Sequence, residues 1–257
     1  MQTHLASERK FIIVPTKRAY LVNGRKLPRV TTILNVISKP WLIEWERKQT
    51  LRRVNDELVN ILDQTIEISR DFIDDLILRA DSEAANVRDQ AADLGKRAHE
   101  AVAKFLRGEE PEISPDVLPC YEAFLNWRKD SGIEVIGSEL CVASVKHGFA
   151  GTLDAIGRHD GKLVLLDWKS SKAIYPIHSL QVAAYCLAWE EEFEEKVEEA
   201  WIVRFPKDHN EGDEDWKPVE AKQIMNLEGA KEAFLNAKRC YDDCRRDFFK
   251  DAIRSNC

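Results

Sequence analysis

The sequence predicts an α/β fold, with a mixed central sheet flanked by helices and a helical N-terminal extension. Two observations support this prediction. Apolar residues recur at three- and four-residue spacing from about residue 41 to 106, and no proline interrupts positions 41–110. From residue 85 onward the expected order is two helices, three strands, a helix, two strands and a helix. At about 150 residues per domain, the 257 residues fit one elaborated domain or a core with a smaller lobe. We expect a basic and helical region at 1–85 and a core at 86–257.

The N-terminal region begins with short strand-like segments. Two apolar runs lie within residues 11–22, and the Asn23-Gly24 pair is typical of a hairpin turn. Thr31 or Thr32 is a candidate cap for a helix that runs into Ile37. The periodic stretch that follows predicts two or three helices. The last is expected from about Glu83 to Arg107, with Gly108 as its stop.

In residues 86–257, segments typical of strands alternate with segments typical of helices. Three β-rich segments at about ten-residue spacing are separated by glycine turns, which is typical of an antiparallel meander. The expected helices are 117–130, 178–193 and 227–253, and the expected strands are 134–144, 149–158, 162–169, 200–205 and a short one near 219.

Composition excludes several classes of protein. No apolar run approaches the ~20 residues of a membrane span, and the N-terminus has no apolar core of a signal peptide. The six cysteines are scattered and form no CxxC pair, so we expect reduced thiols. These features favour a cytoplasmic protein, bacterial or in the host cytoplasm if phage-encoded.

Charge is unevenly distributed along the chain. The net charge is −7, yet residues 1–55 hold 12 Lys and Arg against 3 Asp and Glu. An acidic body can still present a basic lobe to an anionic polymer. The alternative is that these cations only solvate the N-terminal segment. A Glu-rich run at 190–199 allows a third interpretation, a helical scaffold with an acidic partner-binding face, although it also fits a solvated helix end.

The sequence Asp167-Trp168-Lys169 ends an apolar strand. Residues two apart in a strand face the same side, so Asp167 and Lys169 should project together, with Trp168 opposite. A carboxylate beside an ammonium suits a hard cation and a charged partner for substrate. The motif alone is not specific, because Asp215-Trp216-Lys217 repeats it in an acidic loop with no apolar strand before it. An exposed ion pair is the alternative.

Two further carboxylates strengthen the metal hypothesis. Asp154 and Glu139 each lie among apolar residues of a preceding predicted strand. Three neighbouring strands would thus each carry one carboxylate, and oxygen ligands of this kind select Mg²⁺ or Mn²⁺. A buried Asp that caps a turn or pairs with an Arg is the alternative for Asp154.

Two helices add candidates. His99 lies on the helix before the meander, four residues after Gly95, and Gln181 and Tyr185 lie four apart on one face of a later helix. Taken alone, each is an ordinary core or surface residue.

Together these motifs resemble RecB-like nucleases of the PD-(D/E)XK superfamily. The order is Gly95…His99, Glu139, Gly151…Asp154, Asp167-Trp168-Lys169 and Gln181…Tyr185. The opening segment, Val30-Thr31-Thr32-Ile33-Leu34 followed by Trp41 and Trp45, is similar to stand-alone phage or bacterial exonucleases of this group. The resemblance implies a restriction-endonuclease-like core and a metal-dependent DNA nuclease. It favours an exonuclease that acts on single strands or DNA ends in recombination, repair or phage DNA processing.

The resemblance also implies roles. Asp154, Asp167, His99 and the Trp168 backbone carbonyl would hold Mg²⁺ or Mn²⁺, and Glu139 would complete or buffer the site. Lys169 would orient the attacking water and stabilise negative charge. Gln181 and Tyr185 would contact the nucleic acid or brace the site.

Partners and cofactors follow from the same resemblance. The basic N-terminal residues would hold DNA phosphates, Trp41 and Trp45 are candidates for base stacking, and residues 41–107 would form an arch that a strand threads. Some relatives carry an iron–sulfur cluster with one Cys before the His motif. This chain has no Cys before His99, so we expect no cluster. A recombination protein is a candidate partner. The alternative function is a non-catalytic DNA-binding or assembly module on the same fold.

Overall fold

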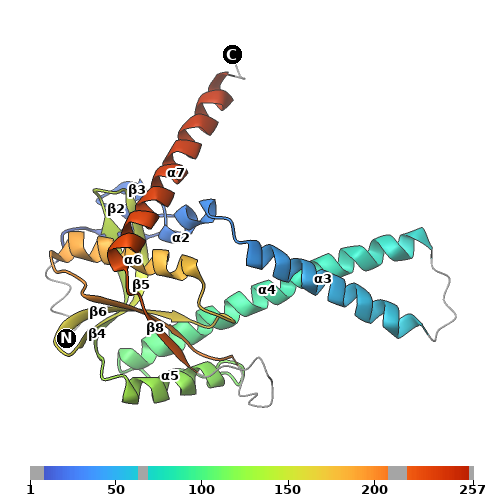
Figure 1. The fold of residues 1–257 in the computed structure, drawn as a ribbon, viewed down its shortest axis with the longest axis horizontal. Coiled ribbons are helices and arrows are strands. Elements are labelled where there is room, and N and C mark those ends of the chain that lie inside the picture. The colour runs from blue at the N-terminus through green and yellow to red at the C-terminus, as the bar shows by residue number, and fades with distance from the viewer. Residues whose placement is uncertain (1–8, 63–68, 208–218, 255–257) are drawn as a thin grey trace. The chain divides into compact units, whose positions relative to one another are not determined.

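The computed structural model describes residues 9–62, 69–207 and 219–254. It contains two sheets and several long helices (Figure 1). The strands are β1 (Ile13–Pro15), β2 (Tyr20–Val22), β3 (Arg25–Leu27), β4 (Glu134–Ser144), β5 (Phe149–His159), β6 (Lys162–Lys169), β7 (Glu199–Arg204) and β8 (Glu220–Gln223). The helices are α2 (Val30–Ile33), the 3₁₀ turn η1 (Leu34–Val36), α3 (Pro40–Ile61), α4 (Arg70–Leu106), α5 (Leu118–Asp130), α6 (Pro176–Phe193) and α7 (Leu227–Arg254).

The central sheet has five strands in the order β4-β5-β6-β7-β8. The pairs β4–β5, β5–β6 and β7–β8 are antiparallel, and β6–β7 is parallel. The parallel pair requires a crossover, which α6 provides. This mixed sheet flanked by helices confirms the predicted fold class, including the meander over β4, β5 and β6.

Helices cover both faces of the central sheet (Figure 1). On one face, α6 and α7 contribute Val182, Trp189 and Phe234 to a core that includes Leu153 and Leu165 of the sheet. On the other face, edge-to-face aromatic contacts join the sheet to α5 and to the end of α4. The rings concerned are Phe105, Phe124, Trp127, Trp168 and Phe205. Both faces are therefore buried, which explains why β6 reads as a continuous apolar run.

A second sheet of three short strands, β1-β2-β3, packs on the β4–β5 hairpin. Asn23 and Gly24, at φ 49° and 79°, form the turn between β2 and β3, as a two-residue turn with positive φ requires. Tyr20, Val22 and Leu27 form a small core with Ala143 and Ala150. This sheet is thus anchored directly to the hairpin that carries Glu139 and Asp154.

The helical boundaries differ from the prediction at two places. Neither Thr31 nor Thr32 caps the first helix, because α2 begins at Val30 after Arg29 and has no side-chain cap. The prediction for the last N-terminal helix was also wrong at its start, since α4 begins at Arg70 rather than near Glu83. Residues 70–83 contain no proline or glycine, so the helix continues through Glu83, and the Ser69 Oγ accepts the Phe72 N–H at its start. Its end at Leu106 agrees with Gly108, whose φ is 79°.

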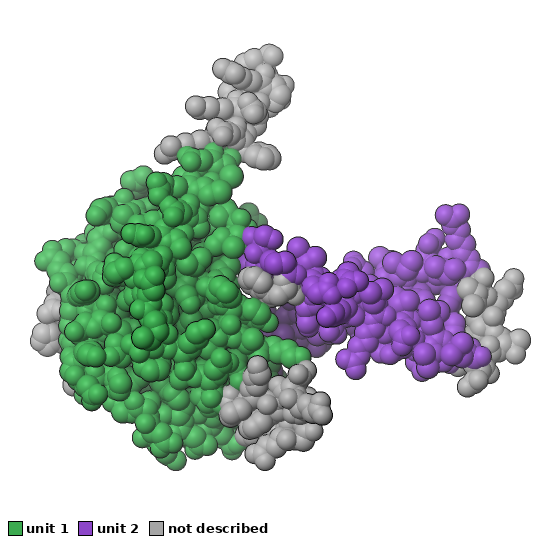
Figure 2. Space-filling view, in the orientation of Figure 1, with its two compact units in different colours: residues 1–37, 97–257 green, residues 38–96 purple. Residues whose placement is uncertain are grey.

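The chain divides into two compact units, coloured separately in Figure 2. Unit 1 contains residues 1–37 and 97–257, and unit 2 contains residues 38–96. The boundary falls within α4, so the segment that carries His99 belongs to unit 1. The division expected from the sequence at residue 85 stays a prediction. Within the described part of the chain, no helix has both the length and the apolar character that crossing a membrane demands.

Candidate active site

The candidate site lies where β5 and β6 diverge. Followed from the turn between the two strands, their ladder ends at the pair Ala155–Leu166, and Asp154 is the next residue of β5 beyond it. Asp154 Oδ2 then accepts the backbone N–H of Trp168 at 2.8 Å. A side-chain carboxylate thus takes a hydrogen bond that a continued ladder would have made. This bond fixes Asp154 against the strand that carries Asp167 and Lys169.

His99 reaches the site from the C-terminal part of α4. Its Nδ1 lies 3.3 Å from Asp154 Oδ1. Burial lowers the pKa of His99, but the Asp154 charge and hydrogen bond outweigh it, and the net pKa is raised. Burial likewise raises the pKa of Asp154, while His99, Lys169 and the Trp168 N–H lower it to below its usual value. Both shifts have a common cause, because each group favours the charged form of the other.

Glu139 completes a close cluster. One nitrogen of His99 and one carboxylate oxygen each of Glu139 and Asp154 lie within 4.8 Å of one another. The ladder pairs Ser138 with Ala155 and Leu140 with Leu153, so Glu139 and Asp154 occupy facing positions between these pairs. Although much of Glu139 is exposed, partial burial of its carboxyl and the nearby Asp154 charge raise its pKa to about 7.

The backbone at Glu139 is unusual. Its φ is 52°, in the left-handed region, in the middle of β4. For a residue with a Cβ this conformation costs on the order of 1 kcal/mol. Backbone strain of this kind concentrates at functional sites, where surrounding packing maintains it. The strained residue here is also the one whose carboxylate joins the cluster.

Asp167 and Lys169 lie next to this cluster. The Lys169 Nζ is 2.5 Å from Asp167 Oδ2, and the Asp167 side chain is completely buried. Asp167 Oδ1 is also buried and has no hydrogen-bond partner among the residues that the structure describes. Burial raises the pKa of Asp167 to about 6, with Lys169 opposing and the Asp154 charge adding to the rise.

The alternation of side chains along β6 agrees with expectation. Asp167 and Lys169 contact each other, whereas the Trp168 ring packs into the aromatic cluster on the α5 side, 5.4 Å from Trp127 and 5.7 Å from Phe124 between ring centroids. Asp167 is outside the 4.8 Å group of His99, Glu139 and Asp154, but its pKa responds to both His99 and Asp154. The predicted set therefore occupies one locality, with Asp167 and Lys169 at its buried side.

Gln181 and Tyr185 contact each other on α6, where the Gln181 Nε2 donates to the Tyr185 hydroxyl at 3.1 Å. Tyr185 is buried, and burial together with the charges of Asp167 and Asp154 raises its pKa well above the usual value. A Cβ at Gly151 would lie 2.4 Å from a carbon of the Tyr185 ring. Gly151 is therefore the residue that leaves space for this ring beside the acids, a role that the sequence motif did not reveal.

Other predicted candidates lie elsewhere. Trp45 is partly buried on α3, and the Trp41 side chain and the second motif, Asp215-Trp216-Lys217, lie outside the described residues. Arg107 was not singled out by sequence, yet its charge lowers the pKa of Glu139. No spacing or motif distinguishes this arginine from other surface arginines. None of the described cysteines, Cys120, Cys141, Cys186, Cys240 and Cys244, is in a disulfide, and Cys257 is outside the described residues.

The donor set fits a hard divalent cation. Carboxylate oxygens and one imidazole nitrogen are ligands that Mg²⁺ and Mn²⁺ accept, whereas soft metals favour thiolates. The unpartnered Oδ1 of Asp167 supports this fit, because a buried carboxylate oxygen without a partner is costly. A bound cation would provide that partner.

Comparisons with known proteins found similar solved structures, all of them distant in sequence. The alkaline exonuclease LHK-Exo of Laribacter hongkongensis is 13% identical, with 63% of this chain and 86% of that chain covered and a TM-score of 0.35. The same exonuclease has also been solved with dAMP, at 12% identity over 63% of this chain and 86% of that chain, with a TM-score of 0.34. A proposed exonuclease from Eubacterium rectale is 11% identical over 57% of this chain and 68% of that chain, with a TM-score of 0.39.

The family assignment does not depend on these distant structures. No curated protein matches the chain. The family model described as the PD-(D/E)XK nuclease superfamily matches residues 78–250, which include every residue of the candidate site. The chain therefore belongs to the PD-(D/E)XK nuclease superfamily.

Proposed function

We propose that this protein is a Mg²⁺- or Mn²⁺-dependent deoxyribonuclease that hydrolyses phosphodiester bonds at DNA ends or in single strands. The observation that carries the proposal is the cluster of His99, Glu139 and Asp154 beside the buried Asp167–Lys169 pair. Acidic and imidazole ligands next to a fixed ammonium are the groups that phosphodiester hydrolysis needs. The exonuclease mode rests on the similarity of the sequence motifs to phage and bacterial exonucleases.

We assign Asp154, Asp167, His99 and the Trp168 carbonyl to the metal, with Glu139 completing or buffering the set. A divalent cation held there would polarise the scissile phosphate and lower the pKa of an attacking water. Metal ligands must be deprotonated. The raised pKa values of Asp167, about 6, and Glu139, about 7, therefore predict that metal affinity increases as pH rises from about 5 to 8.

We assign the role of Lys169 from the fixed position of its ammonium group. Its ammonium is held beside Asp167 with only 14% of the side chain exposed. A cation in such a restricted place needs no reorganisation when negative charge develops on the phosphate oxygens. We assign Lys169 to stabilise that charge and to orient the attacking water. Tyr185 and Gln181 hold the acidic side of the site in place, since the Tyr185 ring packs on Gly151.

The test is digestion of end-labelled linear single strands, linear duplexes and circular single strands, each with Mg²⁺, Mn²⁺ or EDTA. Asp167→Ala and Lys169→Ala should each lower cleavage by about 10²–10³-fold or more, as loss of a charge-stabilising group does. The chain provides its own matched control, because Asp215→Ala with Lys217→Ala removes the same residue types from the second Asp-Trp-Lys sequence. This control should cut normally.

Several outcomes distinguish the alternatives. Undiminished cutting by the purified Asp167→Ala and Lys169→Ala variants contradicts the site assignment. Cutting of circular strands as fast as linear strands contradicts the exonuclease mode. DNA binding by wild-type protein without metal-dependent cutting supports the non-catalytic module instead. The arch over residues 41–107, the pathway and a recombination partner stay predictions.

A further inference from the structure

A large groove in unit 1 lies apart from the carboxylate cluster. Its volume is about 1130 Å³, and three separate parts of the chain line it. These are the edge of the small sheet and the segment after it (residues 17–19 and 25–32), the turn between β4 and β5 (residues 145–148), and one stretch of α7 (residues 238–245). Segments more than 200 residues apart in sequence thus form one surface.

The groove is strongly basic. Its lining includes nine groups that are cationic or able to become so, and one carboxylate, Asp242. The nine are Lys17, Arg18, Arg25, Lys26, Arg29, Lys146, His147, Lys238 and Arg245. In a chain of net charge −7, such a local excess concentrates a positive field that attracts anions.

Much of this positive charge is uncompensated. Lys238 pairs with Asp242, and Arg29 donates to a backbone carbonyl and lies over the Tyr20 ring. By contrast, Lys17, Arg18, Arg25, Lys26 and Lys146 are exposed, and none has an acidic partner among the residues described by the structure. Five like charges held near one another without a counterion are unfavourable for the folded state. A polyanion in the groove would supply the missing counter-charge.

The position of the groove relates it to the candidate active site. The β4–β5 hairpin carries Gly148 and its neighbours at the turn, and it carries Glu139 and Asp154 further along. Five residues of strand separate Phe149 from Asp154, which corresponds to about 17 Å. The small sheet with Lys17 and Lys26 packs on this same hairpin. One wall of the groove and the two carboxylates therefore belong to the same hairpin.

We propose that this groove binds the phosphate backbone of a DNA strand at a distance from the bond that is cut. The inference rests on the proposed nuclease function and adds a binding surface to it. A backbone rather than an acidic protein is favoured, because the groove holds repeated cations next to a site for phosphodiester chemistry. Tyr241, on the groove wall, holds Arg245 in place, since the Arg245 guanidinium lies over its ring and donates to its hydroxyl at 2.7 Å. A duplex shorter than about five base pairs, at 3.4 Å per pair, would not span both places, and neither would a single-stranded dinucleotide.

The test uses the full-length chain with four groove cations neutralised together, as Lys17→Gln, Arg18→Gln, Arg25→Gln and Lys26→Gln. A matched control removes the same charge from exposed positions outside the groove: Lys129, Lys196, Lys222 and Arg239, each to Gln. Fluorescence anisotropy in EDTA measures binding of a labelled 30-nucleotide single strand and a 30-base-pair duplex at several salt concentrations. Melting temperatures confirm that both variants fold, and Lys146→Gln serves as a milder single variant.

The groove variant should bind DNA at least about tenfold more weakly, and the slope of log affinity against log salt should fall by about 3, because each lost phosphate contact removes 0.7–0.9 from the slope. The control should change little. In cleavage assays the groove variant should raise KM for 30-nucleotide substrates and leave kcat unchanged. Its effect should vanish for dinucleotide substrates, which are too short to reach from the cut bond to the groove.

Unchanged DNA affinity and salt slope in the groove variant would overturn the inference. Loss of polyglutamate binding with intact DNA binding would also overturn it, since an acidic peptide would then be the partner. The proposed nuclease function and the proposed DNA-binding groove can be contradicted independently of each other. Wild-type protein that binds DNA through the groove but never cuts contradicts only the nuclease function, whereas normal cutting with unaltered affinity in the groove variant contradicts only the groove.

Discussion

The two compact units of this protein are stabilised by different interactions. In unit 1 both sheet faces are buried under helices, and side chains as large as Trp189 and Phe124 are fully enclosed. In unit 2, the only apolar residues buried among those described are Leu76 and Ala80. Many of its large apolar side chains are exposed instead, namely Ile43, Leu51, Leu58, Val59, Leu62, Ile73, Ile77, Leu78 and Val87.

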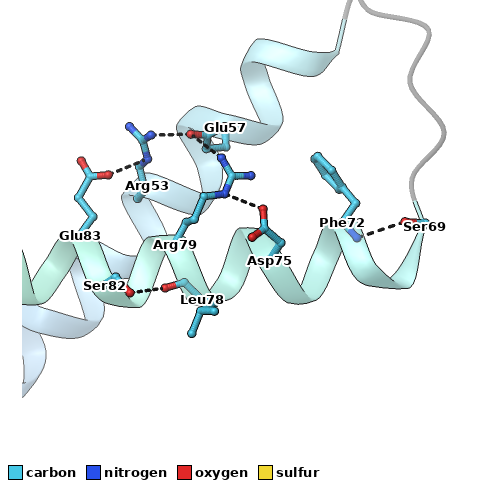
Figure 3. A network of polar contacts seen from close by, with 9 residues as sticks. All are labelled: Arg53, Glu57, Ser69, Phe72, Asp75, Leu78, Arg79, Ser82 and Glu83. Carbon is cyan, nitrogen blue, oxygen red and sulfur yellow. Dashed lines mark hydrogen bonds and ion pairs between the residues drawn. The ribbon is translucent and has the colours of Figure 1, made fainter.

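In unit 2, ion pairs between side chains make up a larger part of the contacts between the two helices. Arg53 pairs with Glu57 and Glu83, and Arg79 pairs with Asp75 and Glu57, which links α3 to α4 (Figure 3). Exposed pairs of this kind contribute about 0–1 kcal/mol each and are screened by salt. The candidate site residues therefore all lie in unit 1, the part of the chain with a dense apolar core. Unit 2 should open locally at much lower cost.

The largest effect should come from a core cavity. Trp189→Ala removes a fully buried ring from unit 1 and should lower the free energy of unfolding by about 3–5 kcal/mol. Leu51→Ala, at a residue of unit 2 that is 54% exposed, should change it by about 0.5 kcal/mol or less. Urea denaturation followed by fluorescence and circular dichroism measures both. Equal losses of unfolding free energy in the two variants would show that the apolar core of unit 2 stabilises the protein as much as that of unit 1.

Gly151→Ala should have the next largest effect, because the added Cβ meets the buried Tyr185 ring at 2.4 Å. Overpacking of this kind costs about 1–3 kcal/mol. Thermal denaturation measures the loss. The double variant Gly151→Ala with Tyr185→Leu should cost less than the sum of the two single changes, since the smaller side chain relieves the clash. Additive costs would mean that the contact does not limit this position.

Glu192 offers a pH test within unit 1. Its side chain is fully buried and its Oε1 has no hydrogen-bond partner among the described residues. Burial raises its pKa to about 7, although Arg9 and the Ala143 N–H oppose the rise. A carboxyl whose folded pKa is raised stabilises the fold below its unfolded pKa and loses that contribution as pH rises through the folded value.

Relative to Glu192→Gln, wild-type protein should therefore lose on the order of 2 kcal/mol of stability between about pH 4.5 and 7.5. Denaturation of both proteins across this pH range measures the difference. The exposed Glu232→Gln on α7 is the control and should run parallel to wild type. Wild-type protein that gains stability relative to Glu192→Gln as pH rises would contradict the assignment.

The smallest expected effect concerns the ion pairs of unit 2. Arg79→Gln should cost about 0.5 kcal/mol at low salt, and this cost should vanish near 1 M salt. Hydrogen exchange provides the sharper measurement. Amides of α3 and of α4 up to Lys96 should exchange faster than those of β5 and β6, and Arg79→Gln should accelerate only the former. Protection of unit 2 equal to that of the central sheet would contradict the comparison.

Much of the central fold was predictable because its signals are local. Strands β4, β5 and β6 each alternate or run apolar between glycine turns, and the observed bounds agree with the expected ones within one residue. The pairing of Asp167 with Lys169 also follows from the two-residue repeat of a strand. By contrast, the start of α4 at Arg70 was not predicted, although Ser69 is a typical N-cap residue and its Oγ accepts the Phe72 N–H at 3.2 Å (Figure 3).

The candidate site was predictable as a set of residues but not as an arrangement. The motif order indicates His99, Glu139, Asp154, Asp167 and Lys169. Nothing local predicts the left-handed backbone at Glu139 or the space that Gly151 leaves for Tyr185. The basic groove was only partly foreseeable, because the positive N-terminal segment is visible in sequence while the contributions of the β4–β5 turn and α7 are not.

The order of strands and helices, the residue types of the site and the uneven charge could be predicted from the chain alone, since they depend on periodicity and composition. The folded structure was needed to show that His99 lies 3.3 Å from an acid 55 positions away, and that cations more than 200 positions apart share one groove. The physical reason is that such proximities depend on the packing of helices against the sheet and on strand divergence at Asp154. Neither leaves a local pattern in the chain.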